Sequence, residues 1–249
     1  MSAPFFSILL PAFNARAHIG RALRDLLGQT FGDFEILVVD DGSTDGTDRI
    51  VRGYSDARIR LITLASNQGL VGALNAGLAE ARGTWVARQD ADDRSHPDRL
   101  ARQRELISQT PDAVLFYSRA TLIDQRGWWR GTLRPPLHDA GLRWDLCFRN
   151  AVPHTSAVFS TEMVRDRLGG YAGDNVTADF DLWSRLLRHG SAAGDGRCLV
   201  SYRNHSGSIM GRENAAAKKS STDGLREILR GNLKEWCGAS ESEAARISD

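Results

Sequence analysis

Residues 84–93 read Thr84-Trp85-Val86-Ala87-Arg88-Gln89-Asp90-Ala91-Asp92-Asp93. The apolar segment Thr84–Ala87 predicts a strand, and three carboxylates follow that strand within four residues. Carboxylates this close together repel one another unless a counter-ion neutralises them. A hard divalent cation that also binds phosphate oxygens is a common counter-ion for such a cluster. The segment therefore predicts a metal–diphosphate site just beyond the end of a strand.

Three more apolar segments precede this strand, and amphipathic helical patterns alternate with them. The predicted strands are Phe5–Leu10, Phe34–Val39 and Arg58–Leu64, and the predicted helices cover residues 19–27, 47–54 and 70–81. Pro11 is expected to end the first strand, because proline has no N–H for the sheet ladder. This alternation is typical of right-handed βαβ units, and it predicts an α/β fold with a mostly parallel sheet flanked by helices.

Candidate ligand-binding residues follow all four predicted strands. They are Phe13-Asn14, Asp40-Asp41, Asn67 and Asp90–Asp93. In an open α/β sheet, ligands bind beyond the carboxyl ends of the strands. We therefore expect these residues to meet at one edge of the sheet, and their convergence indicates a site more strongly than any single motif does.

The alternation of strands and helices loosens after residue 110. The expected elements are a strand at Ala113–Tyr117, a hairpin of Ala120–Asp124 and Trp128–Leu133, a helix at Gly141–Phe148, a strand at Pro153–Phe159, a helix at Ala178–His189 and a strand at Cys198–Tyr202. The polar tail that begins at Ser240 is expected to be frayed.

Charge balance and cysteine content exclude several classes of protein. Lys+Arg 32 and Asp+Glu 31 leave a net charge of +1, whereas a dedicated nucleic-acid binder usually has a strong basic excess. The odd number of cysteines, without metal-ligand spacing, argues against a disulfide framework and fits a reducing cytosol. No apolar run is long enough to span a bilayer, and no signal peptide precedes the first strand. We therefore expect a cytoplasmic protein that does not bind nucleic acid.

Five motifs follow one another within residues 5–205. They are Pro11–Asn14, Val38–Asp45, Asn67–Gly77, Asp90–Leu100 and Ala178–Arg185. In this order and spacing they resemble the inverting family 2 glycosyltransferases with the GT-A (Rossmann-like) fold. This is the bacterial cell-surface polysaccharide type that includes the spore-coat SpsA-like enzymes. The resemblance implies a nucleotide-sugar-binding half at 4–110, a smaller acceptor and catalytic half of the same domain at 111–210, and a C-terminal helix and tail at 211–249.

The same resemblance implies a binding site for a UDP- or dTDP-sugar donor. Asp40 would accept the N3–H of the uracil or thymine ring. Phe13 stands where many relatives have Tyr, so this pocket does not require a phenol hydroxyl. Helix capping and turn formation are the alternative roles of Asp40 and Asp41, and Asp41 is the better candidate for them. The full set of implied donor contacts is Pro11, Ala12, Phe13, Asn14, Asp40, Asn67, Asp90, Ala91 and Asp92.

Asp90 and Asp92 resemble the Asp-x-Asp motif of the family. Asp92 would bind Mg²⁺ or Mn²⁺ directly, and Asp90 would contact the ribose or the metal shell. Asp93 has a competing role, in which it turns inward and caps the helix that follows. His205 resembles a late metal or diphosphate contact of some relatives, although a surface or packing histidine is an equal alternative.

Asp179 resembles the catalytic base of the family, with Asp181 as the second choice. An inverting transfer needs one carboxylate to take the proton from the acceptor hydroxyl. Many relatives have Glu at the preceding position, where this chain has Ala178, so an assisting Glu is in doubt. The alternative role of Asp179 is to cap its helix.

The acceptor is expected to be a saccharide or a lipid-linked saccharide. Its candidate contacts are His154, Trp128 and Trp129, for which structural packing is the alternative. Residues 222–237 carry an apolar stripe with basic residues between its members. This helix either packs onto the domain or lies on an anionic membrane as a peripheral contact.

Two other functions stay open. One is a nucleotide-sugar-binding relative without catalytic activity, although Asp92 and Asp179 are both present. The other is a metal-dependent phosphatase, because residues 40–44 superficially resemble the aspartyl phosphatases of the haloacid dehalogenase type. Those enzymes place Asp-x-Asp directly at the strand end, whereas this chain has two adjacent Asp residues there.

Overall fold

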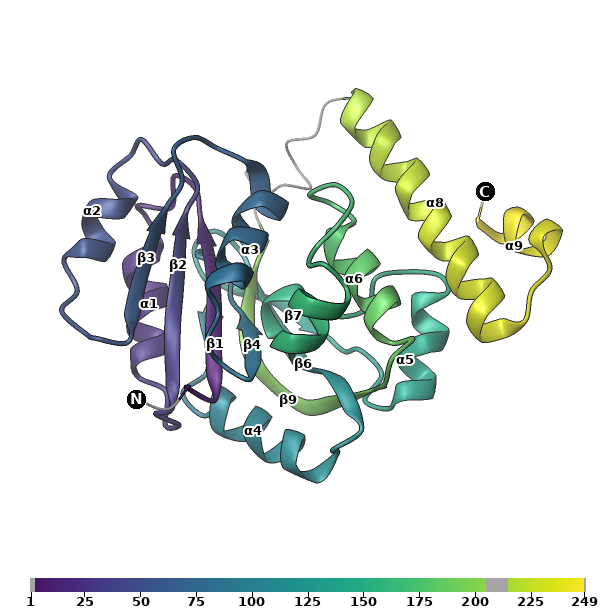
Figure 1. The fold of residues 1–249 in the computed structure, drawn as a ribbon, viewed down its shortest axis with the longest axis horizontal. Helices are drawn as coiled ribbons and strands as arrows, with labels where there is room; N and C mark the ends of the chain where they lie inside the picture. Colours follow the sequence, from purple (N-terminus) through teal and green to yellow (C-terminus); the bar gives the residue numbers. More distant parts are fainter. Residues whose placement is uncertain (1–2, 205–214, 249) are drawn as a thin grey trace.

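The computed structural model describes residues 3–204 and 215–248. Nine strands form one sheet in the order β3-β2-β1-β4-β8-β6-β9-β5, and β7 pairs with β6 outside this path. Helices cover both faces of the sheet (Figure 1). The predicted α/β class is confirmed.

The N-terminal half of the sheet is parallel throughout. It consists of β1 (Phe6–Ala12), β2 (Phe34–Asp40), β3 (Ile59–Thr63) and β4 (Trp85–Arg88). The connecting helices are α1 (Ile19–Leu27), α2 (Thr47–Arg52) and α3 (Gly69–Glu80). These are the elements that the alternation predicted.

Alternate residues of β1 explain why its sequence is apolar throughout. Ile8 and Leu10 belong to the core cluster that contains Leu23 of α1. Leu9 belongs to a second cluster that contains Leu74 of α3. A strand buried on both faces needs an apolar residue at every position.

Pro11 does not end β1, so that prediction was wrong. The strand continues to Ala12, and Pro11 is in register with Val39 of β2. The pairing of β1 with β4 ends at Leu9. Beyond Leu9, β2 is the only strand paired with β1 in the described part of the chain, and a proline is tolerated where one side of a strand is unpaired.

The C-terminal half of the sheet is mixed. Its strands are β5 (Arg94–Ser95), β6 (Ala113–Ile123), β7 (Trp129–Leu133), β8 (Val158–Ser160) and β9 (Ser191–Arg203). β6 runs parallel to β9, whereas β4–β8, β6–β8, β6–β7 and β5–β9 are antiparallel. The helical elements are α4 (Arg99–Gln109), α5 (Asp139–Leu146), η1 (His154–Ser156), η2 (Met163–Arg167) and α6 (Ala178–Leu186).

Several predicted elements in this half have different bounds in the structure. β6 joins two segments that were expected to be separate, and β9 begins well before the predicted Cys198. Pro153–Phe159 was expected to be one strand, but it forms the single turn η1 followed by β8. Register shifts interrupt the β6–β9 pairing. Bulges of this kind break the alternation on which strand prediction depends.

Two helices end the chain, and they lie at the opposite end of the molecule from α2 (Figure 1). They are α8 (Ala215–Cys237) and α9 (Glu241–Ser248). The tail from Ser240 is therefore helical rather than frayed, and its Ala244 is fully buried. Leu225, Ile228, Leu229 and Trp236 of α8 pack against the main core. A membrane contact through residues 222–237 would have to use the opposite, charged face of α8.

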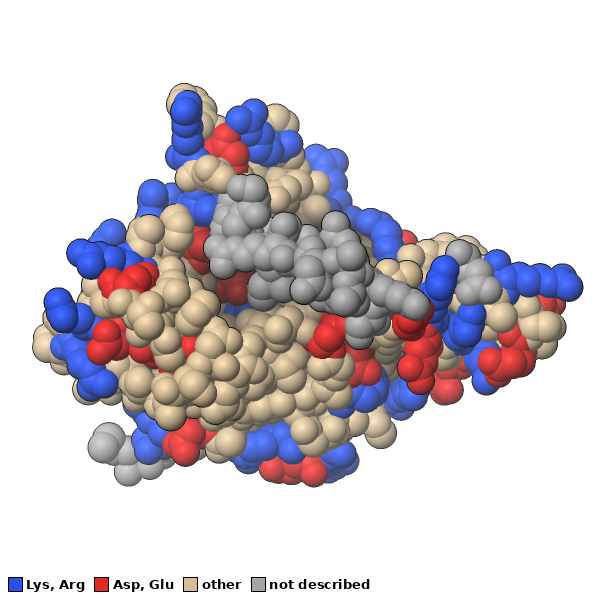
Figure 2. Space-filling model, turned by 90° about the horizontal axis from the view of Figure 1, so that it is seen from above, with Lys and Arg blue, Asp and Glu red and all other residues tan. Residues whose placement is uncertain are grey.

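No helix within residues 3–204 and 215–248 combines the length and the apolar character that crossing a bilayer requires. On the face drawn in Figure 2, basic and acidic side chains are interspersed over the part of the chain that the structure describes. This distribution fits the near-zero net charge and gives no continuous basic surface there for a nucleic acid.

Candidate active site

The carboxyl ends of β1 and β2 lie side by side, with Ala12 in register with Asp40. Asp40 is 2% exposed and accepts the backbone N–H of Ser43 at 3.1 Å. Asn14 donates its backbone N–H to Ser43 Oγ at 2.9 Å and has a positive φ of 49°. Asp40 and Asn14 are thus held beside each other. The exposed ring of Phe13 follows the buried pair Pro11 and Ala12.

Asp41 is occupied with the backbone of the next loop. Its two carboxylate oxygens accept the N–H groups of Gln68 at 2.7 Å and Gly69 at 3.0 Å, at the start of α3. Burial raises the pKa of Asp41, and these two hydrogen bonds oppose the rise. Asn67 Oδ1 also accepts the Gly69 N–H, at 3.1 Å. Asp41 therefore has the structural contacts that were expected of it.

Asp90 lies at the end of β4 and is paired with a buried arginine of the same strand. Arg88 is 0% exposed, and its Nη2 donates to Asp90 Oδ1 at 2.6 Å. A second Arg88 nitrogen donates to the carbonyl of Gln89. Burial raises the pKa of Asp90, the guanidinium of Arg88 lowers it, and the charge of Asp92 raises it again.

Asp93 does not cap the helix that follows it, so that prediction was wrong. The N-terminal residue of α4 is preceded by Asp98, which makes no side-chain cap. Asp93 does turn inward, as expected, but it accepts the backbone N–H of Arg203 at 2.7 Å. Among residues 3–204 and 215–248, its buried Oδ2 has no hydrogen-bond partner. Burial raises the pKa of Asp93 well above its usual range, and the charges of Asp90 and Asp92 add to the rise.

Three buried arginines surround this acidic cluster, which changes the electrostatic argument for a metal. Arg88 and Arg99 are 0% exposed and Arg203 is 7% exposed. Arg99 donates to the carbonyl of Arg88 at 2.7 Å and to the side chains of Gln89 and Ser95. Burial lowers the pKa of Arg99 to about 9, and the charge of Arg88 contributes. The chain therefore supplies part of the counter-charge itself.

Asp179 is the second residue of α6 and is partly exposed. Its Oδ2 accepts Asn150 Nδ2 at 2.9 Å, and its Oδ1 accepts the Phe180 N–H at 2.8 Å. Burial raises the pKa of Asp179 to about 6, against the lowering effect of these hydrogen bonds. Asp174 accepts the N–H groups of Val176 and Thr177 in the turn before α6, whereas Asp179 accepts one N–H of the first turn, that of Phe180.

Asp181 is engaged elsewhere. Its carboxylate accepts Arg185 Nε at 2.7 Å, one turn along α6. The same arginine donates to the carbonyls of Leu168 and Gly170. This ion pair fixes the loop before α6, and it removes the second candidate for a base from the open side of the site.

Tyr202 of β9 is subject to the charges of both Asp179 and the acidic cluster. Burial raises the pKa of Tyr202, and the charges of Asp90, Asp93, Asp92 and Asp179 all add to the rise. One side chain is thus within electrostatic reach of both sets of carboxylates. Two neighbouring residues of η1 give the contacts: Thr155 accepts the Asp90 N–H at 3.3 Å, and His154 lies against Trp183 of α6 with ring centroids 5.8 Å apart. The acidic turn and α6 are therefore both packed against η1.

The candidate acceptor residues differ in exposure. His154 of η1 hydrogen-bonds to the Tyr171 hydroxyl at 3.0 Å. Burial lowers the pKa of His154 well below its usual range, and the charge of Arg88 contributes, so the imidazole is neutral at pH 7. Trp128 and Trp129 are 67% and 69% exposed, so they do not pack against the sheet. His205 lies outside the described residues.

A metal fits this site only as a partner of the diphosphate. The described residues contain no group of three or more His, Cys, Asp or Glu side chains arranged to hold an ion. A cation that bridges phosphates needs only one or two protein carboxylates, with water and phosphate oxygens as its other ligands. Asp92 and Asp90 can supply these, beside the buried carboxylate of Asp93.

Several site residues were missed from the sequence. Arg88 lies within residues 84–93, where it is a single cation between an apolar strand and a group of carboxylates. Thr155 accepts the Asp90 N–H at 3.3 Å, and Asn150 holds Asp179. No local pattern marks Thr155, Asn150 or Arg203, because each reaches its partner through the tertiary fold.

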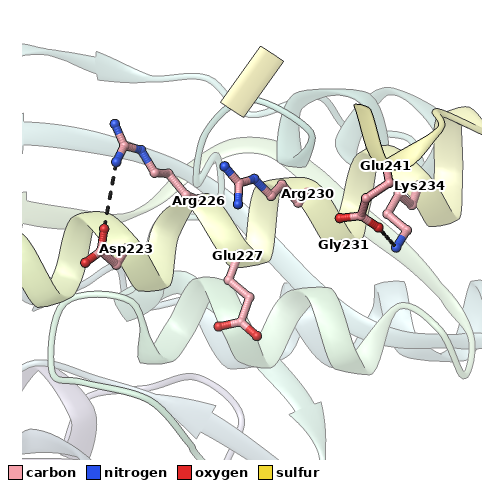
Figure 3. A pocket seen from close by; sticks show the side chains of 7 residues that line it. All are labelled: Asp223, Arg226, Glu227, Arg230, Gly231, Lys234 and Glu241. Atoms are coloured by element: carbon pink, nitrogen blue, oxygen red, sulfur yellow. Dashed lines mark hydrogen bonds and ion pairs between the residues drawn. The ribbon is translucent and has the colours of Figure 1, made fainter. Parts of the chain in front are cut away.

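A hollow on the described surface lies away from these carboxylates, beside α8 and α9 (Figure 3). It has a volume of about 640 Å³. Its charged side chains pair with one another, as in Arg226–Asp223 at 3.8 Å and Lys234–Glu241 at 2.5 Å. Its residues are Asp223, Arg226, Glu227, Arg230, Gly231, Lys234 and Glu241.

Known proteins share both the sequence pattern and the fold. The model of the family described as Glycosyl transferase family 2 matches residues 7–168. The Bacillus subtilis protein named as the teichuronic acid biosynthesis glycosyltransferase TuaG is 33% identical over 242 residues, which cover 94% of this chain and 93% of that protein.

Two solved structures are similar at lower sequence identity. TarS 1-349 of S. aureus, in complex with UDP-GlcNAc, has a TM-score of 0.76 at 18% identity and is matched over 100% of this chain and 70% of that chain. The mannosyltransferase PcManGT of Pyrobaculum calidifontis, in complex with GDP-Man and Mn²⁺, has a TM-score of 0.64 at 18% identity, over 100% and 69% of the two chains. At these identities the likeness concerns the fold alone.

Proposed function

The chain belongs to Glycosyl transferase family 2 and has the GT-A fold, and from this premise we propose that it is a metal-dependent inverting glycosyltransferase. The donor is a UDP- or dTDP-sugar. The acceptor is a hydroxyl of a surface glycan or of a lipid-linked saccharide. The site residues are those of the Asp90–Asp93 turn and of the start of α6, which carries Asp179.

One observation carries this proposal: η1 packs against both carboxylate-bearing elements, since Thr155 accepts the Asp90 N–H at 3.3 Å and His154 lies against Trp183 of α6 with ring centroids 5.8 Å apart. A transfer reaction needs a base at the acceptor and a group that stabilises the leaving diphosphate. The pKa of Asp179, raised by burial to about 6, leaves most of this carboxylate deprotonated at pH 7. It is thus a base whose strength suits a reaction near neutrality.

The donor is held at the ends of β1, β2 and β4. Asp40 accepts the N3–H of the uracil or thymine ring, while Phe13 and Asn14 border the base and ribose. Asp90 contacts the ribose or the metal shell, and its ion pair with Arg88 fixes its direction. Asp92 is the direct metal ligand. When bound, Mg²⁺ or Mn²⁺ stabilises the negative charge that develops on the leaving diphosphate.

Asp179 takes the proton of the acceptor hydroxyl, and the oxygen then forms a bond to the anomeric carbon. The bond from that carbon to the diphosphate breaks on the opposite face, so the configuration inverts. Asn150 orients the Asp179 carboxylate through a hydrogen bond of 2.9 Å. His154, a neutral imidazole beside Tyr171, is an acceptor-side contact.

The phosphatase alternative has no support in this geometry. A carboxylate nucleophile at the end of β2 would need an Asp-x-Asp pair there, whereas Asp41 uses both of its oxygens to hold the start of α3. A non-catalytic relative is the remaining alternative, and it would still bind a nucleotide.

A thermal-shift panel of UDP, dTDP and GDP and their sugar derivatives, with and without Mn²⁺, tests the proposal. We expect a UDP or dTDP compound to raise the melting temperature, and to do so more strongly with Mn²⁺. The donor that stabilises the protein is then tested for turnover. Slow release of UDP or dTDP from this donor would identify an enzyme, whereas a binding protein would release none. If no nucleotide gives a metal-dependent shift, the proposed function is wrong.

A further inference from the structure

Arg203 makes hydrogen bonds to two loops that belong to different parts of the site. It is the last residue of β9 and is 7% exposed. Its backbone N–H donates to Asp93 Oδ1 at 2.7 Å, and its Nε donates to the carbonyl of Asp92 at 2.9 Å. Its Nη1 donates to the carbonyls of Asp124 at 2.7 Å and Gln125 at 2.9 Å.

These contacts use the shape of the guanidinium as well as its charge. Among the described residues, the hydrogen bonds of this guanidinium all go to main-chain carbonyls. Burying a cation is costly, and an apolar side chain would fill the space without that cost. The planar fork of arginine can reach carbonyls on two loops at once, which a single ammonium group cannot do in the same way.

The hydrogen bonds continue from Arg203 into the tip of the β6–β7 hairpin. The Asp124 carboxylate accepts the backbone N–H of Trp128 at 2.9 Å and of Arg126 at 2.9 Å. Arg130 donates to the same carboxylate. The exposed pair Trp128 and Trp129 is therefore tied through Asp124 and Arg203 to the Asp92–Asp93 turn.

We propose that Arg203 is a positioning residue that holds the Trp128–Trp129 hairpin at a fixed distance from the Asp92–Asp93 turn. This inference rests on the function proposed above, in which the turn binds the donor diphosphate. The hairpin then places acceptor-binding surface beside the donor, and nucleotide binding at the turn stabilises the hairpin tip through Arg203.

The test compares Arg203→Lys with Arg143→Lys in the full chain. Arg143 is a matched control, because it also donates to two main-chain carbonyls, those of Leu187 and Gly190, in a different part of the molecule. Trypsin cleavage after the exposed Arg126 reports on the hairpin tip. Its rate follows the population of opened hairpin when opening is fast relative to cleavage.

We expect Arg203→Lys to accelerate cleavage after Arg126 by about tenfold or more, and Arg143→Lys to change it by less than about twofold. We also expect UDP with Mn²⁺ to slow this cleavage in the wild type. In Arg203→Lys the same ligands should still raise the melting temperature but should no longer protect Arg126. If Arg203 had a purely structural role, Arg203→Lys would not lose the protection of Arg126 while keeping the rise in melting temperature.

Equal cleavage rates in the two variants, or protection by UDP and Mn²⁺ that persists in Arg203→Lys, would overturn the proposal. If Arg203→Lys does not fold, Asp124→Ala releases the hairpin from its other side, and the same loss of protection is expected. Failure of the proposed function has a different signature, because wild-type protein would then show no metal-dependent shift with any nucleotide.

Discussion

The two halves of the sheet contribute to the site in different ways. In the N-terminal half, β1, β2 and β4 are parallel, and each delivers a site residue directly at its carboxyl end. In the C-terminal half, mixed pairing and register shifts bring in residues from η1, α6 and β9. The first half thus presents the donor site through regular geometry, whereas the second half completes the site through long-range contacts.

Residues that bind the donor are therefore held differently from the catalytic base and from the residues that position other groups. Asp40 and Asp90 sit at strand ends and hold their places through neighbours in their own loops and strands. Asp179 depends on Asn150, which is 29 residues away, and Asp93 is held by Arg203, 110 residues away. Changes in the C-terminal half should therefore affect turnover more than donor binding.

Asp179→Asn should have the largest effect on turnover. The amide cannot take a proton from the acceptor, and general-base catalysis contributes about 10²–10⁴-fold to a rate. Sugar transfer, or donor hydrolysis where no acceptor is known, should therefore fall by about that factor. Binding of UDP with Mn²⁺, measured by thermal shift, should stay close to the wild-type value. Unchanged turnover would show that another group is the base.

Asp40→Asn and Asp92→Asn should separate two parts of donor binding in the N-terminal half. Loss of a hydrogen bond to a charged group costs about 1.5–3 kcal/mol, which corresponds to about 10–100-fold in affinity. Asp40→Asn should weaken UDP binding to this extent with or without Mn²⁺. Asp92→Asn should remove the gain from Mn²⁺ and leave metal-free UDP binding intact.

Asp41→Asn is the control for this pair. Because Asp41 holds the N–H groups of Gln68 and Gly69, its loss should lower the melting temperature rather than select against one ligand. Isothermal titration with UDP distinguishes the three variants. Equal losses in all of them would indicate that the loops of the N-terminal half form one structural unit.

The pH dependence of turnover should reflect the burial of Asp179. Its pKa is raised from 3.8 to about 6, and the deprotonated form is the base. The value of kcat/KM for the free enzyme should therefore rise by up to about tenfold per unit below pH 6 and level off above it. A profile that stays flat between pH 5 and 7 would contradict this assignment.

The same shift has the opposite effect on stability. A raised pKa means that the folded state favours the protonated carboxyl, so this contribution to stability is present below pH 3.8 and is lost as the pH rises through 6. Relative to wild type, Asp179→Asn should therefore gain more in melting temperature at pH 8 than at pH 4. Such a gain would mark a site where activity is maintained at the expense of stability.

The N-terminal half and its strand-end residues could be predicted from sequence because their causes are local. Hydrophobic periodicity located β1 to β4, and Asp40 and Asp90 followed from the strand ends. The role expected for Asp93 was wrong, because its partner is the backbone of Arg203. The counter-charge from Arg88, Arg99 and Arg203 also escaped prediction, since it depends on which side chains the tertiary fold buries together.

The contact between α5 and α8 allows a smaller test of how the C-terminal half is held together. Cys147, which follows α5, and Cys237, which ends α8, have their Sγ atoms 3.5 Å apart and 90 residues apart in sequence. Burial raises the pKa of Cys147 to about 12, so Cys147 is a thiol at neutral pH and the exposed Cys237 is the accessible partner. Both cysteines are free in this structure.

Diamide should join this pair, because it accepts the two hydrogens that the thiols lose and becomes a hydrazine as the disulfide forms. One free thiol, that of Cys198, should remain in a thiol titration, and Cys198→Ser should not prevent the cross-link. The cross-link closes a long loop, so the melting temperature should rise by about 2–4 °C for each kcal/mol gained. Cys237→Ser should abolish this rise, and a cross-linked dimer in place of the internal bridge would show that α8 does not stay packed on α5.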